Sequence, residues 1–65
     1  MKRAIAIVSR MPENGRPTVQ IGLEGAWCID NENPRRWPPG EPVLVRYHPQ
    51  DQFATIIDPE TLERL

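Results

Sequence analysis

The sequence predicts a mostly β fold: a small five-stranded antiparallel barrel or half-barrel, SH3-like or OB-like, with a short C-terminal helical turn. Two patterns predict it. Apolar residues alternate with polar ones over residues 18–30, as in a strand with one buried face. Elsewhere, short apolar runs are separated by loops rich in Pro and Gly, which is typical of small barrels. A chain of 65 residues accommodates one domain, which we place over residues 1–65.

The first predicted strand covers residues 3–9, a short run rich in apolar and β-branched side chains. Two prolines then bracket an Asn-Gly pair, which predicts a projecting loop over residues 11–17. Within residues 18–30, Gly22 and Gly25 interrupt the alternation. We therefore expect either one strand bent near Gly25 or two strands with a tight corner, over 18–24 and 26–30.

Four prolines lie within residues 31–42, which excludes a helix or a central strand there. The remaining strands are predicted over 43–48 and 52–57. Asp58, Pro59 and Glu60 follow in the order of an N-cap, a first-turn proline and a first-turn acid, so a helical turn is expected near 59–64. A turn this short must dock on the barrel, through Leu62 and Leu65.

The predicted core consists of the apolar residues that share one face of these strands, plus one leucine of the helical turn. A chain of this length buries only about 60% of its unfolded surface, so the domain depends on good packing or on self-association. The members are Ile5, Ile7, Val19, Ile21, Leu23, Ile29, Val43, Val45, Ile57 and Leu62.

The composition of the chain limits the classes of function that it can have. The net charge is −1, with 8 basic and 9 acidic residues mixed along the chain, so no charged tail stands out. No apolar run approaches the roughly 20 residues of a membrane span, and we expect a cytoplasmic protein without a membrane partner. One cysteine, Cys28, excludes an internal disulfide. Because Cys28 and His48 are the only soft ligands, we expect neither a metal nor a cofactor.

One stretch carries a resemblance to a known family. Val43-Leu44-Val45-Arg46-Tyr47-His48-Pro49-Gln50-Asp51, followed by Ala54-Thr55-Ile56-Ile57-Asp58-Pro59-Glu60, resembles the C-terminal β-barrel of Mu-type transposases and related integrases, over residues 41–60. In that family a V-x-V-R-Y-x-P-x-D strand and turn leads into the strand that closes the barrel. The resemblance implies an SH3-like barrel that contacts nucleic acid or a protein partner. The family's acidic catalytic core is absent, so no transposase or nuclease activity is implied.

Five residues form the candidate binding surface. Arg35, Arg36 and Trp37 lie in the Pro-rich loop, where guanidinium groups can hold phosphates and an indole can stack on a base. The alternative is that Trp37 folds back as a lid on the barrel. Arg46 and His48 share one face of a predicted strand and could contact a phosphate, the alternative being a surface arginine beside a turn histidine.

No catalytic constellation is evident. His48 is the only candidate imidazole base, and Cys28, the only thiol, lies between Trp27 and Ile29, where an inert thiol is expected. We therefore expect no enzyme, but a binding module that contacts nucleic acid or a nucleic-acid-associated protein. The alternatives are a protein-interaction adaptor or regulator, and a small homo-oligomeric structural subunit. Arginines that converge in space would favour nucleic acid, whereas an exposed apolar patch would favour a protein partner.

Overall fold

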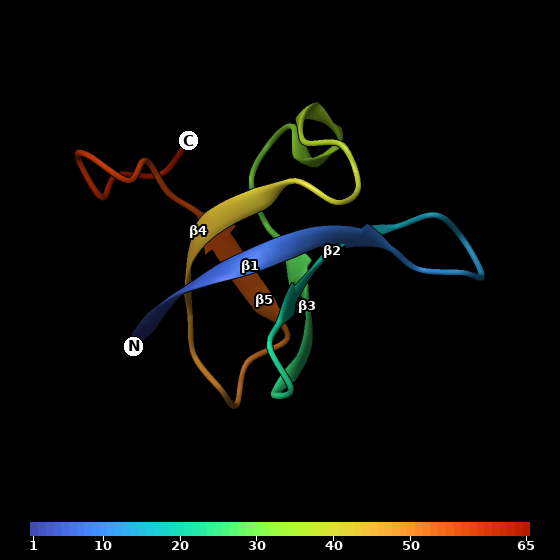
Figure 1. Cartoon of the computed structure of the whole chain (residues 1–65). Coiled ribbons are helices and arrows are strands. Elements are labelled where there is room, and N and C mark those ends of the chain that lie inside the picture. Colours follow the sequence, from blue (N-terminus) through green and yellow to red (C-terminus); the bar gives the residue numbers. More distant parts are fainter.

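The chain forms a closed five-stranded barrel in a computed structural model that describes residues 1–65 (Figure 1). The strands are β1 (Lys2–Arg10), β2 (Pro17–Ile21), β3 (Gly25–Ile29), β4 (Pro42–Tyr47) and β5 (Phe53–Ile56), and a 3-10 helix, η1 (Pro34–Arg36), lies between β3 and β4. Each observed strand lies within two to three residues of a predicted one. The predicted fold class, a small five-stranded barrel, is confirmed.

The strand order is β1-β2-β3-β5-β4, with β4 returning to β1. Four of the five pairings are antiparallel, and β3 pairs with β5 in parallel. A parallel pair needs a long crossover, which β4 and its two loops supply here. Of the two predicted alternatives, this order is the OB-like one.

The β2–β3 connection takes the two-strand form. Gly22 and Gly25 have φ angles of +49° and +139°, which glycine adopts without strain, and the three-residue turn 22–24 joins the strands. Leu23 stands at the tip of this turn and is fully exposed, so its predicted place in the core is wrong. The alternation that suggested it ends at Ile21, where the strand ends.

β1 is oriented opposite to the prediction. Ala6 and Val8 are buried, whereas Ile5 and Ile7 are 65% and 44% exposed, so the predicted burial of the two isoleucines is wrong. Period two determines which residues share a face but not which face is inward. The interior opposite β1 is filled by larger side chains from the other strands, and small alanines fit the space that remains.

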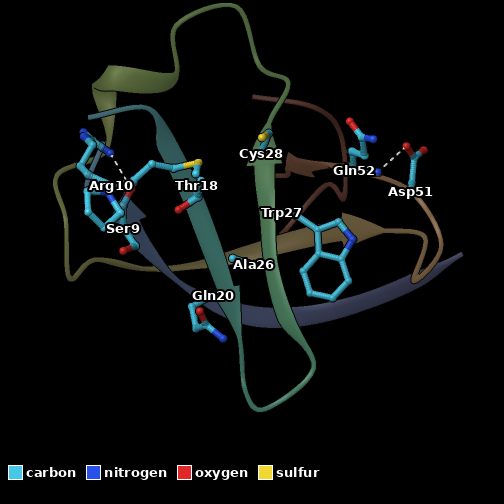
Figure 2. A pocket seen from close by; sticks show the side chains of 11 residues that line it. Ser9, Arg10, Thr18, Gln20, Ala26, Trp27, Cys28, Asp51 and Gln52 are labelled. Carbon is cyan, nitrogen blue, oxygen red and sulfur yellow. Dashed lines mark hydrogen bonds between the residues drawn. The ribbon is translucent and has the colours of Figure 1, made fainter. Parts of the chain in front are cut away.

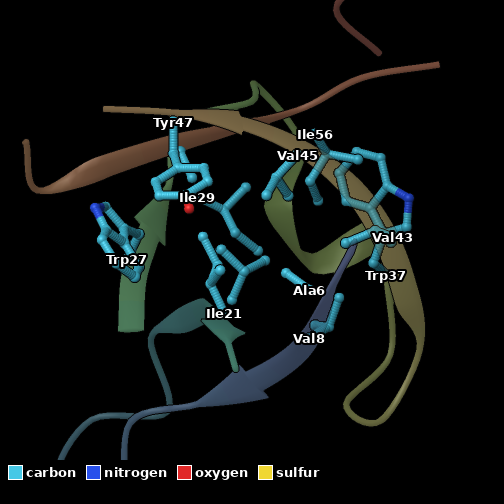
Figure 3. Close-up of a cluster of buried hydrophobic side chains, with 12 residues drawn as sticks. Ala6, Val8, Ile21, Trp27, Ile29, Trp37, Val43, Val45, Tyr47 and Ile56 are labelled. Atoms are coloured by element: carbon cyan, nitrogen blue, oxygen red, sulfur yellow. The ribbon is translucent and has the colours of Figure 1, made fainter. Parts of the chain in front are cut away.

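Twelve buried side chains form the core of the barrel (Figure 3). The predicted burial of Val19, Ile21, Ile29, Val43, Val45 and Ile57 is confirmed. Three aromatic rings complete the interior: Trp27 packs edge-on against Tyr47, with ring centroids 5.0 Å apart, and Trp37 closes the opposite end. The full cluster comprises Ala6, Val8, Val19, Ile21, Trp27, Ile29, Trp37, Val43, Val45, Tyr47, Ala54 and Ile56.

The predicted C-terminal helical turn is only a hydrogen-bonded turn over residues 59–61, and no helix forms there. Asp58 Oδ1 accepts hydrogen bonds from the backbone N–H groups of Glu60 and Thr61, as an N-cap does, and the Leu62 N–H donates to the Asp58 carbonyl at 2.8 Å. Leu62 then adopts a left-handed φ of +63°, which ends the turn.

The chain after this turn folds back on the barrel. Arg64 forms an isolated bridge with Ile57, and the Leu65 N–H donates to the Ile56 carbonyl at 3.1 Å. Leu62 itself is exposed, so its predicted place in the core is wrong. Backbone hydrogen bonds hold the segment, and leucine burial contributes little.

Candidate binding surfaces

β4 separates the five predicted surface residues into two groups. Arg35 and Arg36 belong to η1, and Trp37 follows directly, all before β4 begins. Arg46 and His48 lie at the other end of β4. The predicted residues therefore lie at opposite ends of the barrel, and the arginines do not converge on one surface.

Trp37 is the lid of the barrel. Its side chain is 7% exposed, and the Arg10 guanidinium donates to its backbone oxygen at 3.1 Å. The Arg36 guanidinium lies 5.4 Å from the centroid of the indole, in a cation–π contact on the outer side. Because the ring is buried beneath Arg36, it has no open face on which a base could stack.

Arg46 faces Arg3 directly across the β1–β4 pair. The only ion pairs in the structure join Lys2 to Glu24, at 3.8 Å, and Arg64 to Asp30, at 3.5 Å, so neither arginine of this pair has an acidic partner. Opposed like charges across two strands destabilise a sheet.

His48 makes hydrogen bonds within the turn in which it lies. Its Nδ1 accepts a hydrogen bond from the Gln50 N–H at 3.3 Å, and its own carbonyl accepts one from the Asp51 N–H at 2.9 Å. The histidine is exposed and has no nucleophile hydrogen-bonded to it.

A groove of about 610 Å³ crosses the outer face of β2 and β3 (Figure 2). Four outward side chains form its floor: Thr18 and Gln20 from β2, Ala26 and Cys28 from β3. None of the four is charged, so the floor is electrically neutral.

Two loops form the walls. One wall consists of Ser9, Arg10, Met11 and Pro12, at the start of the β1–β2 loop. The other consists of Asp51 and Gln52, at the end of the β4–β5 loop. Loop segments roughly 40 residues apart in the chain thus bound a single site.

Hydrogen bonds hold the second wall against β3. The Cys28 N–H donates to the Gln52 carbonyl at 2.9 Å, and Asp51 Oδ1 accepts from the Gln52 N–H at 2.7 Å. Phe53 comes next and pairs with Cys28 in the parallel β3–β5 register. Its ring is 40% exposed on the outer surface beside the groove, where a planar ligand could stack.

Trp27, a core residue of β3, also borders the groove and has an unpaired donor. The residue is only 6% exposed, and its indole N–H is the one buried side-chain polar atom in the structure without a hydrogen-bond partner. Leaving a buried N–H unpaired costs about 1–3 kcal/mol. The fold itself therefore leaves this buried indole N–H without a partner.

The groove carries little charge. Arg10 donates to the carbonyls of Ser9 and Trp37, both at 3.1 Å, which holds its guanidinium against the loop backbone. Asp51 supplies a nearby negative charge.

No group of three or more His, Cys, Asp or Glu side chains could hold a metal ion. No helix in the structure is long and apolar enough to cross a membrane.

The sequence contained a partial signal for this site. Gln20 is a polar residue at an even position of the alternation over 18–30, and Thr18, Ala26 and Cys28 share that face. Cys28 is a free thiol that is half-buried on the groove floor. The loop residues could not be assigned to the groove because only folding brings them together.

Comparison of the chain with protein-family models, with curated proteins and with solved structures found no match. The resemblance to transposase barrels over residues 41–60 stays a prediction.

Proposed function

We propose that this protein is a non-catalytic OB-like binding module that holds a single-stranded nucleic acid across β2 and β3. One observation carries the proposal: a groove of about 610 Å³ lies on the β2–β3 face between the β1–β2 and β4–β5 loops. OB barrels bind extended oligonucleotides on this face and between these two loops. The fold determines where a ligand would lie, and the side chains in the groove must determine which ligand is bound.

The lining suits bases better than it suits phosphates. The side-chain amide of Gln52 offers both donors and acceptors to base edges, and the Gln20 side chain, whose Nε2 donates to the Gly22 carbonyl at 3.1 Å, offers its oxygen as an acceptor. Phe53 offers an exposed ring beside the groove, and stacking of a base on an aromatic ring contributes about 1–3 kcal/mol.

The charge of the chain limits the affinity. Nucleic-acid affinity depends mainly on neutralised phosphates, and here Arg16 is the one exposed guanidinium in the β1–β2 loop. With a net charge of −1, we expect weak binding, with a dissociation constant on the order of 10⁻⁴ M, and an affinity that changes little with salt because few phosphates are neutralised.

Fluorescence anisotropy with labelled oligothymidylate and oligouridylate, at low and moderate salt, tests the proposal. Phe53→Leu removes the ring but keeps an apolar side chain, and it should weaken binding by roughly 5- to 150-fold, the equivalent of one lost base stack. Leu62→Ala is the matched control, because Leu62 is as exposed as Phe53 but lies on the C-terminal turn. Its affinity should equal that of the wild type.

Cys28 provides an independent readout, because its thiol is free and lies on the groove floor. A bound oligonucleotide should slow alkylation of Cys28 by a maleimide. If neither oligonucleotide bound at protein concentrations near 10⁻⁴ M in low salt, the proposal would be wrong. If an oligonucleotide bound but neither slowed the alkylation of Cys28 nor lost affinity in Phe53→Leu, the nucleic acid would lie on another surface.

A further inference from the structure

We propose that the β3 side of β5, beyond the end of β3, is a strand-addition site for an extended peptide in which an arginine precedes a large apolar residue. The chain's own C-terminal segment, residues 63–65, occupies this site in the structure and competes with such a peptide. The site uses residues 30–31 and 56–58, none of which lines the β2–β3 groove, so the inference does not depend on the proposed function.

The first observation is that β5 extends past its neighbour β3. The two strands pair at only two register positions, and the last bond between the two segments runs from the Asp30 N–H to the Ala54 carbonyl, at 3.1 Å. The chain then leaves β5 and enters the Pro-rich loop. Because β5 continues to Ile56, its backbone groups beyond Ala54 on this side have no strand beside them from β3.

The C-terminal segment takes the place of the missing strand. It runs antiparallel to β5, and the Asp58 N–H donates to the Glu63 carbonyl at 2.8 Å. The Leu65 N–H donates to the Ile56 carbonyl at 3.1 Å, and the Leu65 carbonyl accepts from Asn31 Nδ2 at 2.7 Å. All three bonds use the backbone of the segment, so an extended peptide of another sequence can form them as well.

One side chain of the segment adds a specific contact. The Arg64 guanidinium donates to the Asp30 carbonyl at 2.5 Å and lies 3.5 Å from the Asp30 carboxylate. A guanidinium presents several donors in a fixed fork, so it can reach both acceptors at once, which the compact ammonium of a lysine does less well. The site therefore selects arginine at this position of a bound peptide.

The position after the arginine favours an apolar side chain larger than leucine. Leu65 borders two hollows, of about 370 Å³ and about 200 Å³, and Trp37 lines both of them. The leucine nevertheless stays 42% exposed. A larger ring at this position can extend into a hollow and bury more apolar surface than leucine does. The chain's own segment is therefore not the best occupant of the site.

The C-terminal segment is also held weakly enough to leave the site. Every residue from 59 to 65 is exposed, and the φ of +63° at Leu62 is strained for a residue with a Cβ atom. Segments with few buried apolar contacts open at the lowest free energies in a protein. Opening exposes the backbone groups of Ile56 and Asp58 together with the Asp30 carboxylate, which a peptide can then bind.

These observations favour a separate peptide over the C-terminal segment of a second copy. The segment of a second copy has the same sequence as the segment already bound. The bound segment has the advantage of its tether, which gives it an effective concentration on the order of millimolar. A peptide with a better apolar residue can overcome that advantage, whereas an identical segment cannot.

Nuclear magnetic resonance of the full chain tests the proposal with short peptides whose ends are acetylated and amidated. One peptide has the sequence of residues 61–65, Thr-Leu-Glu-Arg-Leu, and a second ends in Phe instead of Leu. Both should shift the signals of the Asp58 amide and of the Asn31 side-chain amide. The Phe peptide should bind about fourfold tighter, the gain from burying roughly one further CH₂ group. A peptide with Glu in place of Arg should bind about fivefold more weakly than the Leu peptide, because it loses the ion pair with Asp30.

Two variants of the full chain test the competition with its own segment. Arg64→Ala weakens the segment but leaves Asp30 and β5 unchanged, so it should bind the Phe peptide about fivefold tighter than the wild type does. Arg35→Ala is the matched control, because it removes the same charge from an exposed residue of η1 that lies outside the site. Its affinity for the Phe peptide should equal that of the wild type.

Three results would overturn the proposal. The first is that no peptide shifts the Asp58 signal at about 10 mM, above the effective concentration of the tethered segment. The second is that the Arg and Glu peptides bind equally well. The third is that Arg64→Ala binds the Phe peptide no better than Arg35→Ala does. Equal affinities of the Leu and Phe peptides would overturn the preference for a large apolar residue.

Discussion

The side chain of Asn31 takes the place of a missing strand neighbour. The residue is buried, its Oδ1 accepts the Ile56 N–H at 2.8 Å, and its Nδ2 donates to the backbone oxygens of Ile56, at 3.0 Å, and Leu65, at 2.7 Å. One amide therefore satisfies both backbone groups of Ile56 and attaches the C-terminal segment to the barrel.

Asn31→Ala should destabilise the fold by about 1–3 kcal/mol, because it leaves the buried N–H of Ile56 without a partner and removes the bond to the Leu65 carbonyl. For a domain of this size, each kcal/mol lowers the melting temperature by about 4–8 °C, which circular dichroism can measure. Asn33→Ala is the control, because Asn33 is exposed and its side chain makes no capping hydrogen bond. An equal loss in both variants would contradict the role assigned to Asn31.

Tyr47 gives the structure a titration signal at alkaline pH. Its hydroxyl donates to Glu24 Oε2 at 2.8 Å, and this hydrogen bond, followed by burial and the negative charge of Glu24, raises the pKa of Tyr47 above its ordinary value of 10.0. The folded state holds the phenol proton more tightly than the unfolded state does. The stability that the protonated phenol contributes is therefore complete at pH values below the unfolded pKa, and it is lost as the pH rises through the folded pKa.

The titration is measurable because Tyr47 is the only tyrosine in the chain. Ultraviolet absorbance should show its phenol ionising above pH 10.0, and Glu24→Gln should bring the midpoint back toward that value. An unchanged midpoint in Glu24→Gln would mean that burial alone causes the shift.

At the scale of the element, the two faces of each strand differ sharply in what a substitution costs. Ile21 on β2 is buried in the core, whereas Ile5 on β1 points outward. An isoleucine-to-alanine substitution at each position can therefore test which face of the strand points into the core.

Ile21→Ala should destabilise the protein by about 2–5 kcal/mol, since it removes buried methyl groups and leaves a cavity. Ile5→Ala in dilute protein should change stability by no more than about 0.5 kcal/mol, as surface substitutions usually do. Urea denaturation measures both. A large loss for Ile5→Ala at low concentration would show that β1 is turned the other way.

At the scale of the whole molecule, the charged side chains are spread over separate surfaces of the barrel. The arginines predicted to share a surface lie at the two ends of β4, and the groove itself contains a carboxylate, Asp51. The neutral β2–β3 face and the even charge balance both limit electrostatic attraction between this protein and nucleic acid.

Asp51→Asn should tighten binding of a single-stranded oligonucleotide by up to about fivefold, because a unit charge 4 Å from a phosphate contributes about 1 kcal/mol in water. The asparagine oxygen can still accept the Gln52 N–H. Glu60→Gln, on the exposed C-terminal turn, changes net charge equally and serves as the control in the same anisotropy titration. Equal gains from both variants would point to net charge rather than to the groove.

Local chemistry in the sequence determined most of the barrel's parts. The alternation over 18–30 located β2 and β3, Gly22 and Gly25 located the corner between them, and Asp58 located the C-terminal turn. Each signal acts within a few residues, where backbone preference and side-chain period decide the outcome. The burial of Val19 and Val45 follows from the same period.

The tertiary structure alone decided which surfaces face solvent and which residues meet. Ile5 and Ile7 share a face by period, but the space left by the other strands turned that face outward. The Trp37 ring became a lid because the loop before β4 folds back across the barrel end. Gln20 and Gln52 line one groove only because β5 pairs with β3, a contact between distant segments that no local pattern in the chain encodes.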